Sequence, residues 1–356
     1  MSTVIFILVD GLGYERLGRA LSDHPGMLLG SLGRAGCLSR LTSVLPSTTA
    51  TALATLNTGL TPQEHGLVGY KLYLQEVDEI ANMIRLSPVN RHATYSRKRL
   101  DPQAFFDHDT LYHRLHDLGV TSRVIVKSQY VNSPLSRMFY RGAEIVGHPG
   151  THDAFVTLRR MIEQRDGSPT FLFLYWDPVD NVSHFYGPDV AEVDAEIVGF
   201  DNALRDHVID RINAPDVALI VSADHGLVYT PPAQRLAFND APEALSLLER
   251  PPSGDSRLPY LHVRPEGLAG LDDALQRRFN DVALLHDRER LLDEGWFGIG
   301  ELHPAVRSRL GDAIVTVQGG WKLSYRWSPD EIESVGCHGG LDSAEMYVPL
   351  IAARLG

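Results

Sequence analysis

Cysteine is scarce in this chain of 356 residues, which has only Cys37 and Cys337. Two cysteines exclude a disulfide framework, and they favour a reducing, cytoplasmic location. The apolar run at residues 4–9 follows no basic segment and is too short to cross a membrane. We therefore expect a buried strand there, not a signal peptide, and we expect no association with a membrane.

Positive charge is also in deficit, because 33 Lys and Arg face 45 Asp and Glu, a net charge of −12. An acidic chain is poorly suited to anionic polymers or membrane surfaces, which argues against nonspecific nucleic-acid binding. A small anionic substrate remains compatible with this charge, because bound metal ions can reverse the local field.

Short apolar runs predict the strands of a parallel sheet that is covered on both faces. They lie at residues 4–9, 123–126, 170–175 and 217–221. Helical spacing between them, at 111–118, 154–164 and 190–212, completes a strand–helix alternation. We expect an α/β fold with layers α/β/α and a mostly parallel central sheet.

The stretch from residue 230 to about 259 contains Pro-Pro and Ser-Gly signals typical of loops. After it, a strand is expected at 260–263, a helix at 271–280 and a strand at 313–317. We predict that residues 230–334 form a smaller inserted cap, with continuity of this region with the core as the alternative, and that 1–229 with 335–356 form the main core.

Acidic and histidine side chains follow the predicted strands, at the edge of the sheet where ligands bind in α/β folds. Asp10-Gly11 follows the first strand, although Asp-Gly is also a common turn. Asp180 and His184 follow the third strand and share one face of a helical turn, with Asp177 as an alternative acid. A carboxylate and an imidazole at this spacing suit zinc or manganese.

Two further groups complete the set. Asp224-His225-Gly226 follows the strand at 217–221, where a turn can direct both side chains to one ion. His338 lies in a glycine-rich segment, beside Cys337, which is a second possible ligand. Three Asp and three His are enough for two metal ions.

Hydroxyl side chains gather at residues 46–49, Pro-Ser-Thr-Thr, just before an expected helix at 50–57. A hydroxyl at a helix start lies near the positive end of the dipole, where anions bind. On this segment alone, an ordinary N-cap is the better explanation. A structural role is expected for His65, and solvent exposure for His108, His113 and His116.

In their order and spacing, these motifs resemble the alkaline phosphatase superfamily. The nearest pattern is that of the nucleotide pyrophosphatase/phosphodiesterase branch, which includes phosphonoacetate hydrolases. The motifs are Asp10, Pro46 to Thr49, Thr58-Gly59, His65-Gly66, Asp180 with His184 and Gly187-Pro188, Asp224-His225-Gly226 and His338-Gly339. The resemblance is good over residues 4–70, 171–226 and 335–339 and poor over 71–119 and 230–334.

The resemblance implies an enzyme that hydrolyses phosphodiester or pyrophosphate bonds of a small substrate, through a covalent intermediate on Thr49, with Thr48 as runner-up. It implies two divalent metal ions, zinc or else manganese. One would be held by Asp10, Asp224 and His225, and the other by Asp180, His184 and His338. A phosphonate hydrolase, a phosphomonoesterase and a degenerate, non-enzymatic metal-binding regulator are alternatives. A sulfatase or a phosphoglycerate mutase fits the residues poorly.

One departure from the family pattern concerns the substrate. Family phosphodiesterases carry an Asn after the His-Gly motif that helps to hold a phosphate oxygen, and Tyr70 stands at that position here. We predict that Tyr70 binds substrate, through its phenol or as an apolar wall. The alternative is that Tyr70 packs with Tyr73.

Overall fold

The structure is a computed structural model that describes residues 2–91, 93–328 and 333–355. The chain divides into two compact units. The first comprises Met1–Ser43, His108–Leu227 and Tyr347–Gly356, and the second comprises Val44–Asp107 and Val228–Met346.

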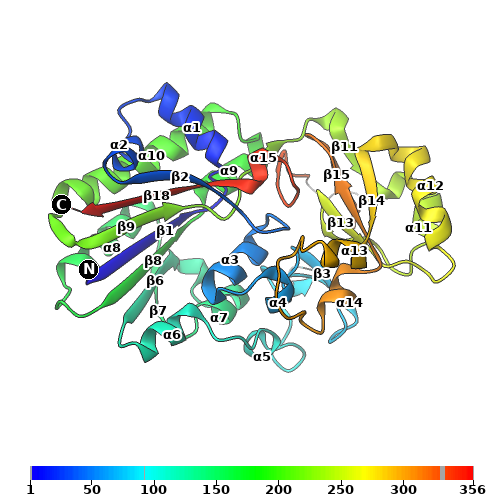
Figure 1. The fold of residues 1–356 in the computed structure, drawn as a ribbon, viewed down its shortest axis with the longest axis horizontal. Helices are drawn as coiled ribbons and strands as arrows, with labels where there is room; N and C mark the ends of the chain where they lie inside the picture. Colours follow the sequence, from blue (N-terminus) through cyan, green and yellow to red (C-terminus); the bar gives the residue numbers. More distant parts are fainter. Residues whose placement is uncertain (1, 92, 329–332, 356) are drawn as a thin grey trace. The chain divides into compact units, whose positions relative to one another are not determined.

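A seven-stranded sheet forms the centre of the first unit (Figure 1). Its strands are β1 (Thr3–Val9), β2 (Cys37–Thr42), β6 (Thr121–Lys127), β7 (Glu144–His148), β8 (Thr170–Trp176), β9 (Ala214–Ser222) and β18 (Tyr347–Leu355). They lie in the order β2-β18-β9-β1-β8-β6-β7. β1 is parallel to β8 and β9, and β6 is parallel to β7 and β8, whereas β18 is antiparallel to both of its neighbours. The expected mostly parallel sheet is confirmed.

Helices cover both faces of this sheet. They are α1 (Tyr14–Asp23), α2 (Leu28–Ala35), α6 (Leu111–Asp117), α7 (Pro134–Phe139), α8 (Thr151–Glu163), α9 (Pro178–Tyr186) and α10 (Ala191–His207). Apolar side chains of α1, α2, α8 and α10 join Ile5, Ile7 and Val9 in one core. On the other face, Tyr112 of α6 packs on Phe171 of β8, beside Tyr140. The alternation of side chains along the buried strands therefore supplies both interfaces of an α/β/α sandwich.

The second unit contains several small sheets (Figure 1). Their strands are β3 (Lys71–Leu74), β4 (Glu79–Asn82), β5 (Ser87–Pro88), β10 (Val228–Tyr229), β11 (Arg235–Ala237), β12 (Ser253–Asp255), β13 (Leu258–Leu261), β14 (Ala283–Asp287), β15 (Ala313–Val317), β16 (Lys322–Ser324) and β17 (Gly336–Cys337). The helices are α3 (Thr49–Thr58), α4 (Pro62–His65), α5 (Pro102–Phe105), α11 (Pro242–Ser246), α12 (Leu268–Phe279), α13 (Arg288–Asp293), α14 (Val306–Leu310) and α15 (Ser343–Met346). The antiparallel sheet β12-β13-β15-β14 packs with α11 and α12 around a second core.

These units differ from the expected core and cap, because residues 44–107 group with 228–346. Hydrogen bonds between distant segments cause this grouping: for example, Gln63 N donates to the Phe297 carbonyl at 2.9 Å. Such pairings leave no trace in local sequence patterns. In the part of the chain that the structure describes, no helix is both long and apolar enough to span a bilayer.

Candidate functional site

The carboxyl ends of β1, β8 and β9 lie side by side, because the three strands are parallel neighbours. Asp10 follows β1, and Gly11 has a φ of +76°, which a glycine adopts without strain. A Cβ at Gly11 would lie 2.9 Å from the Cα of Asp180. The Asp180 N–H also donates to the Asp10 carbonyl at 3.1 Å. Gly11 is therefore needed for the close approach of these two acidic residues.

His225 joins the acids at the end of β9. Its Nε2 lies 3.5 Å from Oδ1 of Asp10 and 3.6 Å from Oδ2 of Asp224. Its Nδ1 lies 3.1 Å from the carbonyl of Gly226, which accepts the hydrogen bond when Nδ1 carries the proton. That tautomer directs the lone pair of Nε2 toward the carboxylates, as a metal-binding imidazole requires. The side chains of all three residues are almost fully buried.

Asp180 and His184 lie one turn apart on α9, with 3.3 Å between Oδ1 of Asp180 and Nε2 of His184. One ligand atom from each of Asp10, Asp180 and His225 lies within 4.8 Å of the others. The structure thus brings Asp180, a predicted ligand of the second metal, together with Asp10 and His225, two predicted ligands of the first.

The alternative acid, Asp177, is engaged elsewhere. Its carboxylate pairs with Nζ of Lys127 at 2.6 Å. It accepts a hydrogen bond from the phenol of Tyr130 at 2.8 Å and another from the amide of Asn181 at 2.8 Å. Asp177 therefore anchors the start of α9, and Asp180 is the acid that faces the group.

The group concentrates negative charge inside the protein. Burial raises the pKa of Asp10 well above its ordinary value, and the Asp224 and Asp180 carboxylates raise it further. Burial likewise raises the pKa of Asp224. Oδ1 of Asp10 and Oδ2 of Asp224 are buried and accept no hydrogen bond from any residue that the structure describes. Such carboxylates are costly without a cation, so this donor set fits a divalent metal.

The second unit holds the hydroxyl segment. Thr48 is the N-cap of α3, but its side chain makes no capping hydrogen bond, and Thr49 is the first helical residue. Thr49 is almost fully buried at the helix N-terminus. The ordinary N-cap interpretation therefore fails for the side chain of Thr48, while Thr49 occupies the position that favours an anion.

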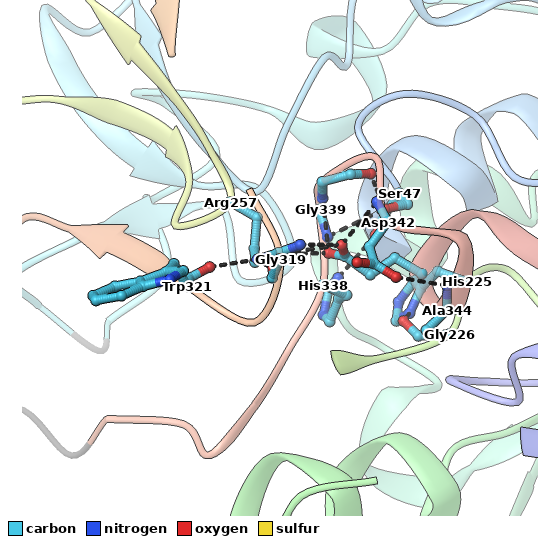
Figure 2. Close-up of polar contacts among 12 residues, drawn as sticks. Ser47, His225, Gly226, Arg257, Gly319, Trp321, His338, Gly339, Asp342 and Ala344 are labelled. Atoms are coloured by element: carbon cyan, nitrogen blue, oxygen red, sulfur yellow. Dashed lines mark hydrogen bonds and ion pairs between the residues drawn. The ribbon is translucent and has the colours of Figure 1, made fainter. Parts of the chain in front are cut away.

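His338 is tied to this segment within the second unit. Nδ1 of His338 lies 2.9 Å from the carbonyl of Ser47, and the N–H of Gly339 donates to Oγ of Ser47 at 3.2 Å. Oγ of Ser47 in turn donates to the carbonyl of Gly340 at 2.9 Å. Figure 2 shows Ser47 facing His338 and Gly339. A proton on Nδ1 again selects Nε2 as the atom for a metal.

A buried ion pair supports residues 338–342, the His338 loop. Figure 2 shows its cationic member, Arg257. Arg257 and Glu345 are almost fully buried, and their charged groups lie 2.7 Å apart. Glu345 also accepts hydrogen bonds from the backbone N–H of Gly340 at 2.9 Å and of Asp342 at 3.3 Å. Neither Arg257 nor Glu345 has a motif around it that the sequence analysis could have used.

Two hydrogen bonds of its backbone fix the position of Tyr70. Its N–H donates to Oδ2 of Asp255 at 3.1 Å, and its carbonyl accepts from Met83 at 2.9 Å. A Cβ at Gly339, which has a φ of +106°, would lie 2.6 Å from Cβ of Asp255. Asp255 therefore connects the backbone of Tyr70 to the His338 loop, and contact of Tyr70 with substrate stays a prediction.

The remaining histidines differ in their surroundings. Nε2 of His65 lies 3.0 Å from Oγ1 of Thr55, and its Nδ1 accepts from the N–H of Leu67 at 3.1 Å, which agrees with a structural role. His116 is exposed, as expected, whereas His108 and His113 are only partly exposed. Tyr175, which no sequence motif marks, donates its hydroxyl to Oδ2 of Asp10. The parallel register of β1 and β8 is the signal that places it there.

An α/β/α sandwich with buried carboxylates and an imidazole at the strand ends is an arrangement that suits metal-dependent hydrolysis. Residues 4–341 match the model of the family described as Type I phosphodiesterase / nucleotide pyrophosphatase. The chain belongs to this family and is a hydrolase of phosphoric esters. This assignment favours an enzyme over a degenerate regulator.

Solved structures with the same fold are similar to this chain at low identity. Murine ectonucleotide pyrophosphatase / phosphodiesterase 5 has a TM-score of 0.74 and 16% identity, over 98% of this chain and 87% of that one. An inactive threonine-to-alanine variant of the murine protein, in complex with AMP, has a TM-score of 0.75 and 16% identity, over 99% and 88%. Phosphonoacetate hydrolase from Sinorhizobium meliloti 1021, in complex with phosphonoformate, has a TM-score of 0.72 and 19% identity, over 98% and 89%. By sequence, no curated protein matches significantly.

Proposed function

We propose that this enzyme hydrolyses phosphodiester or pyrophosphate bonds of small molecules, with Thr49 as the nucleophile. The observation that carries the proposal is the buried group of Asp10, Asp180, Asp224 and His225 at the strand ends. The family assignment supports the reaction class. The murine relative supports both the nucleophile and the substrate class, because its threonine-to-alanine variant is inactive and was obtained with AMP.

We further propose two divalent ions, zinc in the first instance and manganese as the alternative. Asp10, Asp224 and His225 would hold one ion, and Asp180, His184 and His338 the other. Such ions would neutralise the phosphate oxygens and make a hydroxyl group more acidic. The hydrogen bonds from Nδ1 of His225 and His338 to backbone carbonyls support this assignment, since they orient each ring for binding through Nε2.

The chain's own contribution is the placement of the nucleophile. The hydroxyl of Thr49 gives up its proton to solvent and Oγ1 forms the new bond to phosphorus, while the bond from phosphorus to the leaving oxygen breaks and that oxygen departs with the electron pair. The first turn of α3 presents backbone N–H groups and the positive end of a ten-residue helix to the anionic phosphoryl group. Water then cleaves the phospho-threonine and regenerates the hydroxyl. Tyr70 is proposed to contact the esterified group.

A phosphonate substrate is the second candidate, because the phosphonoacetate hydrolase has a TM-score within 0.02 of the murine enzyme's 0.74. Purified enzyme with zinc or manganese is offered bis(p-nitrophenyl) phosphate, p-nitrophenyl phosphate, ATP and phosphonoacetate. We expect the diester or ATP to have the highest kcat/KM. Fastest turnover of phosphonoacetate would replace the proposal with the phosphonate alternative, and no turnover of any compound would contradict both.

A further inference from the structure

The two oxygens of the Asp10 carboxylate have different surroundings. Oδ2 accepts a hydrogen bond from the hydroxyl of Tyr175. Oδ1 is buried, accepts no hydrogen bond from any residue in the described ranges, and lies 3.5 Å from Nε2 of His225. The carboxylate is therefore fixed at one oxygen and directs the other toward Asp180, Asp224 and His225, which with Asp10 form the proposed metal-binding group.

The sheet explains how Tyr175 reaches Asp10. Tyr175 is the partner of Leu8 in the parallel register of β1 and β8, and the N–H of Asp10 donates to the carbonyl of Trp176 at 2.9 Å. The ring of Tyr175 lies 6.4 Å, centroid to centroid, from the ring of Tyr130. Backbone pairing and ring contact together limit where the phenol can point.

Tyr130 has the same chemistry but a different partner. Its hydroxyl donates to Asp177, whose carboxylate is paired with Lys127 and is not part of the metal-binding group. The two neighbouring phenols thus each donate to a carboxylate, and that of Tyr175 is the one that contacts a proposed ligand directly. This pair offers a matched comparison inside one fold.

We propose that Tyr175 is a positioning residue for metal binding: its hydroxyl holds Oδ2 of Asp10, so that Oδ1 alone is presented to the ion. This inference rests on the proposed function, in which Asp10 is a metal ligand. A carboxylate that is already oriented loses less rotational freedom when it binds a metal. Removal of such an outer partner typically weakens metal affinity by about 10- to 100-fold.

The test compares Tyr175→Phe with Tyr130→Phe, which remove the same atom from adjacent rings. Zinc affinity of the metal-free proteins is measured by competition with a chromophoric chelator, and the melting temperature of each metal-free protein is recorded. We expect Tyr175→Phe to weaken zinc binding at one site by about 10- to 100-fold. Tyr130→Phe should bind zinc as the parent does, because its partner Asp177 is not a proposed ligand.

A double-mutant cycle tests whether the effect passes through Asp10. In an Asp10→Asn background, Tyr175→Phe should cause no further loss of zinc affinity. Equal affinities for Tyr175→Phe and the parent, equal losses in both tyrosine variants, or a Tyr175→Phe protein that does not fold would each overturn the proposal. Failure of the parent itself to bind zinc or manganese would contradict the proposed function, and is thereby distinguished from a failure of the positioning role.

Discussion

Nδ1 of His338 lies 2.9 Å from the backbone carbonyl of Ser47, two residues before Thr49. The segment that contains the proposed nucleophile and the segment that contains the last proposed metal ligand are therefore hydrogen-bonded to each other. The side chain of Ser47 adds two more bonds to the glycines that follow His338. The proposed nucleophile and the proposed ligand are thus placed by one shared loop structure, although Thr49 and His338 are 338 − 49 = 289 positions apart.

His338→Ala should remove one of two bound metals and leave the protein folded. The imidazole contributes one hydrogen bond to a loop that Ser47 and Glu345 hold independently. Metal content by elemental analysis and circular dichroism check this expectation. His65→Ala is the control, since buried His65 bonds Thr55; it should lower the melting temperature and keep both metals. An unfolded His338→Ala protein would indicate a structural role.

Glu345→Ala should destabilise the protein by about 3–5 kcal/mol, because it leaves the buried guanidinium of Arg257 without its carboxylate. Urea unfolding measures the change. Glu243→Ala is a matched control, since the pair of Glu243 with Arg277 is exposed and should contribute about 0–1 kcal/mol. Similar losses of stability in the two variants would show that the buried pair stabilises the protein no more than the exposed pair does.

Thr49→Ala should lower kcat by about 1,000-fold or more, because no other group replaces a lost nucleophile. Metals and fold should be retained. Thr48→Ala should be much milder, since Thr48 is the N-cap and its hydroxyl makes no capping bond. Both are followed by turnover of bis(p-nitrophenyl) phosphate. If Thr48→Ala is the inactive variant, Thr48 is the nucleophile and our assignment is displaced by one residue.

The strands of the first unit could be predicted where burial alone determines them. β1 and β8 are continuous apolar runs, and the acids and histidines after β1, β8 and β9 meet because the strands are parallel neighbours. β2 was not predicted, because all six of its residues are exposed and its sequence lacks an apolar pattern. β18 contains Pro349, and a proline argues against a strand when the neighbouring strands are unknown.

The second unit shows why other features were missed. Most of its strands have two to four residues, so long-range pairing decides them and local propensity does not. The same holds for the positioning contacts of the site. The contact of His338 with the Ser47 carbonyl joins two loops that are distant in the sequence, and the contact of Tyr175 with Asp10 depends on the register of β8 against β1. Neither leaves a local residue pattern.

The buried side chain of His262 should make the folded protein less stable at acid pH. Burial lowers the pKa of His262 to about 4, with Arg250 as the next cause. Below about pH 6.5, the ordinary pKa of a histidine in the unfolded state, the folded state therefore binds fewer protons than the unfolded state. The stability that depends on a neutral His262 is fully present above that pH and is lost as the pH falls toward 4. Between about pH 7 and pH 5 the loss is about 2 kcal/mol. His262→Gln should remove this part of the pH dependence in urea unfolding; an unchanged slope would mean that His262 titrates normally.

Tyr70→Phe should lower kcat/KM for the preferred ester by about tenfold, the loss of one modest hydrogen bond. The backbone of Tyr70 is fixed by Asp255 and Met83, so the substitution removes a hydroxyl without moving the chain. Tyr70→Asn restores the side chain that family phosphodiesterases carry at this position, and diesterase activity should be kept or raised. Tyr73→Phe is the control, because Tyr73 bonds Asp78 and stacks under Arg250, both within the second unit. If both Tyr70 variants match the parent on every ester, Tyr70 does not contact substrate. The preference for a diester would then have to come from residues outside the His-Gly motif.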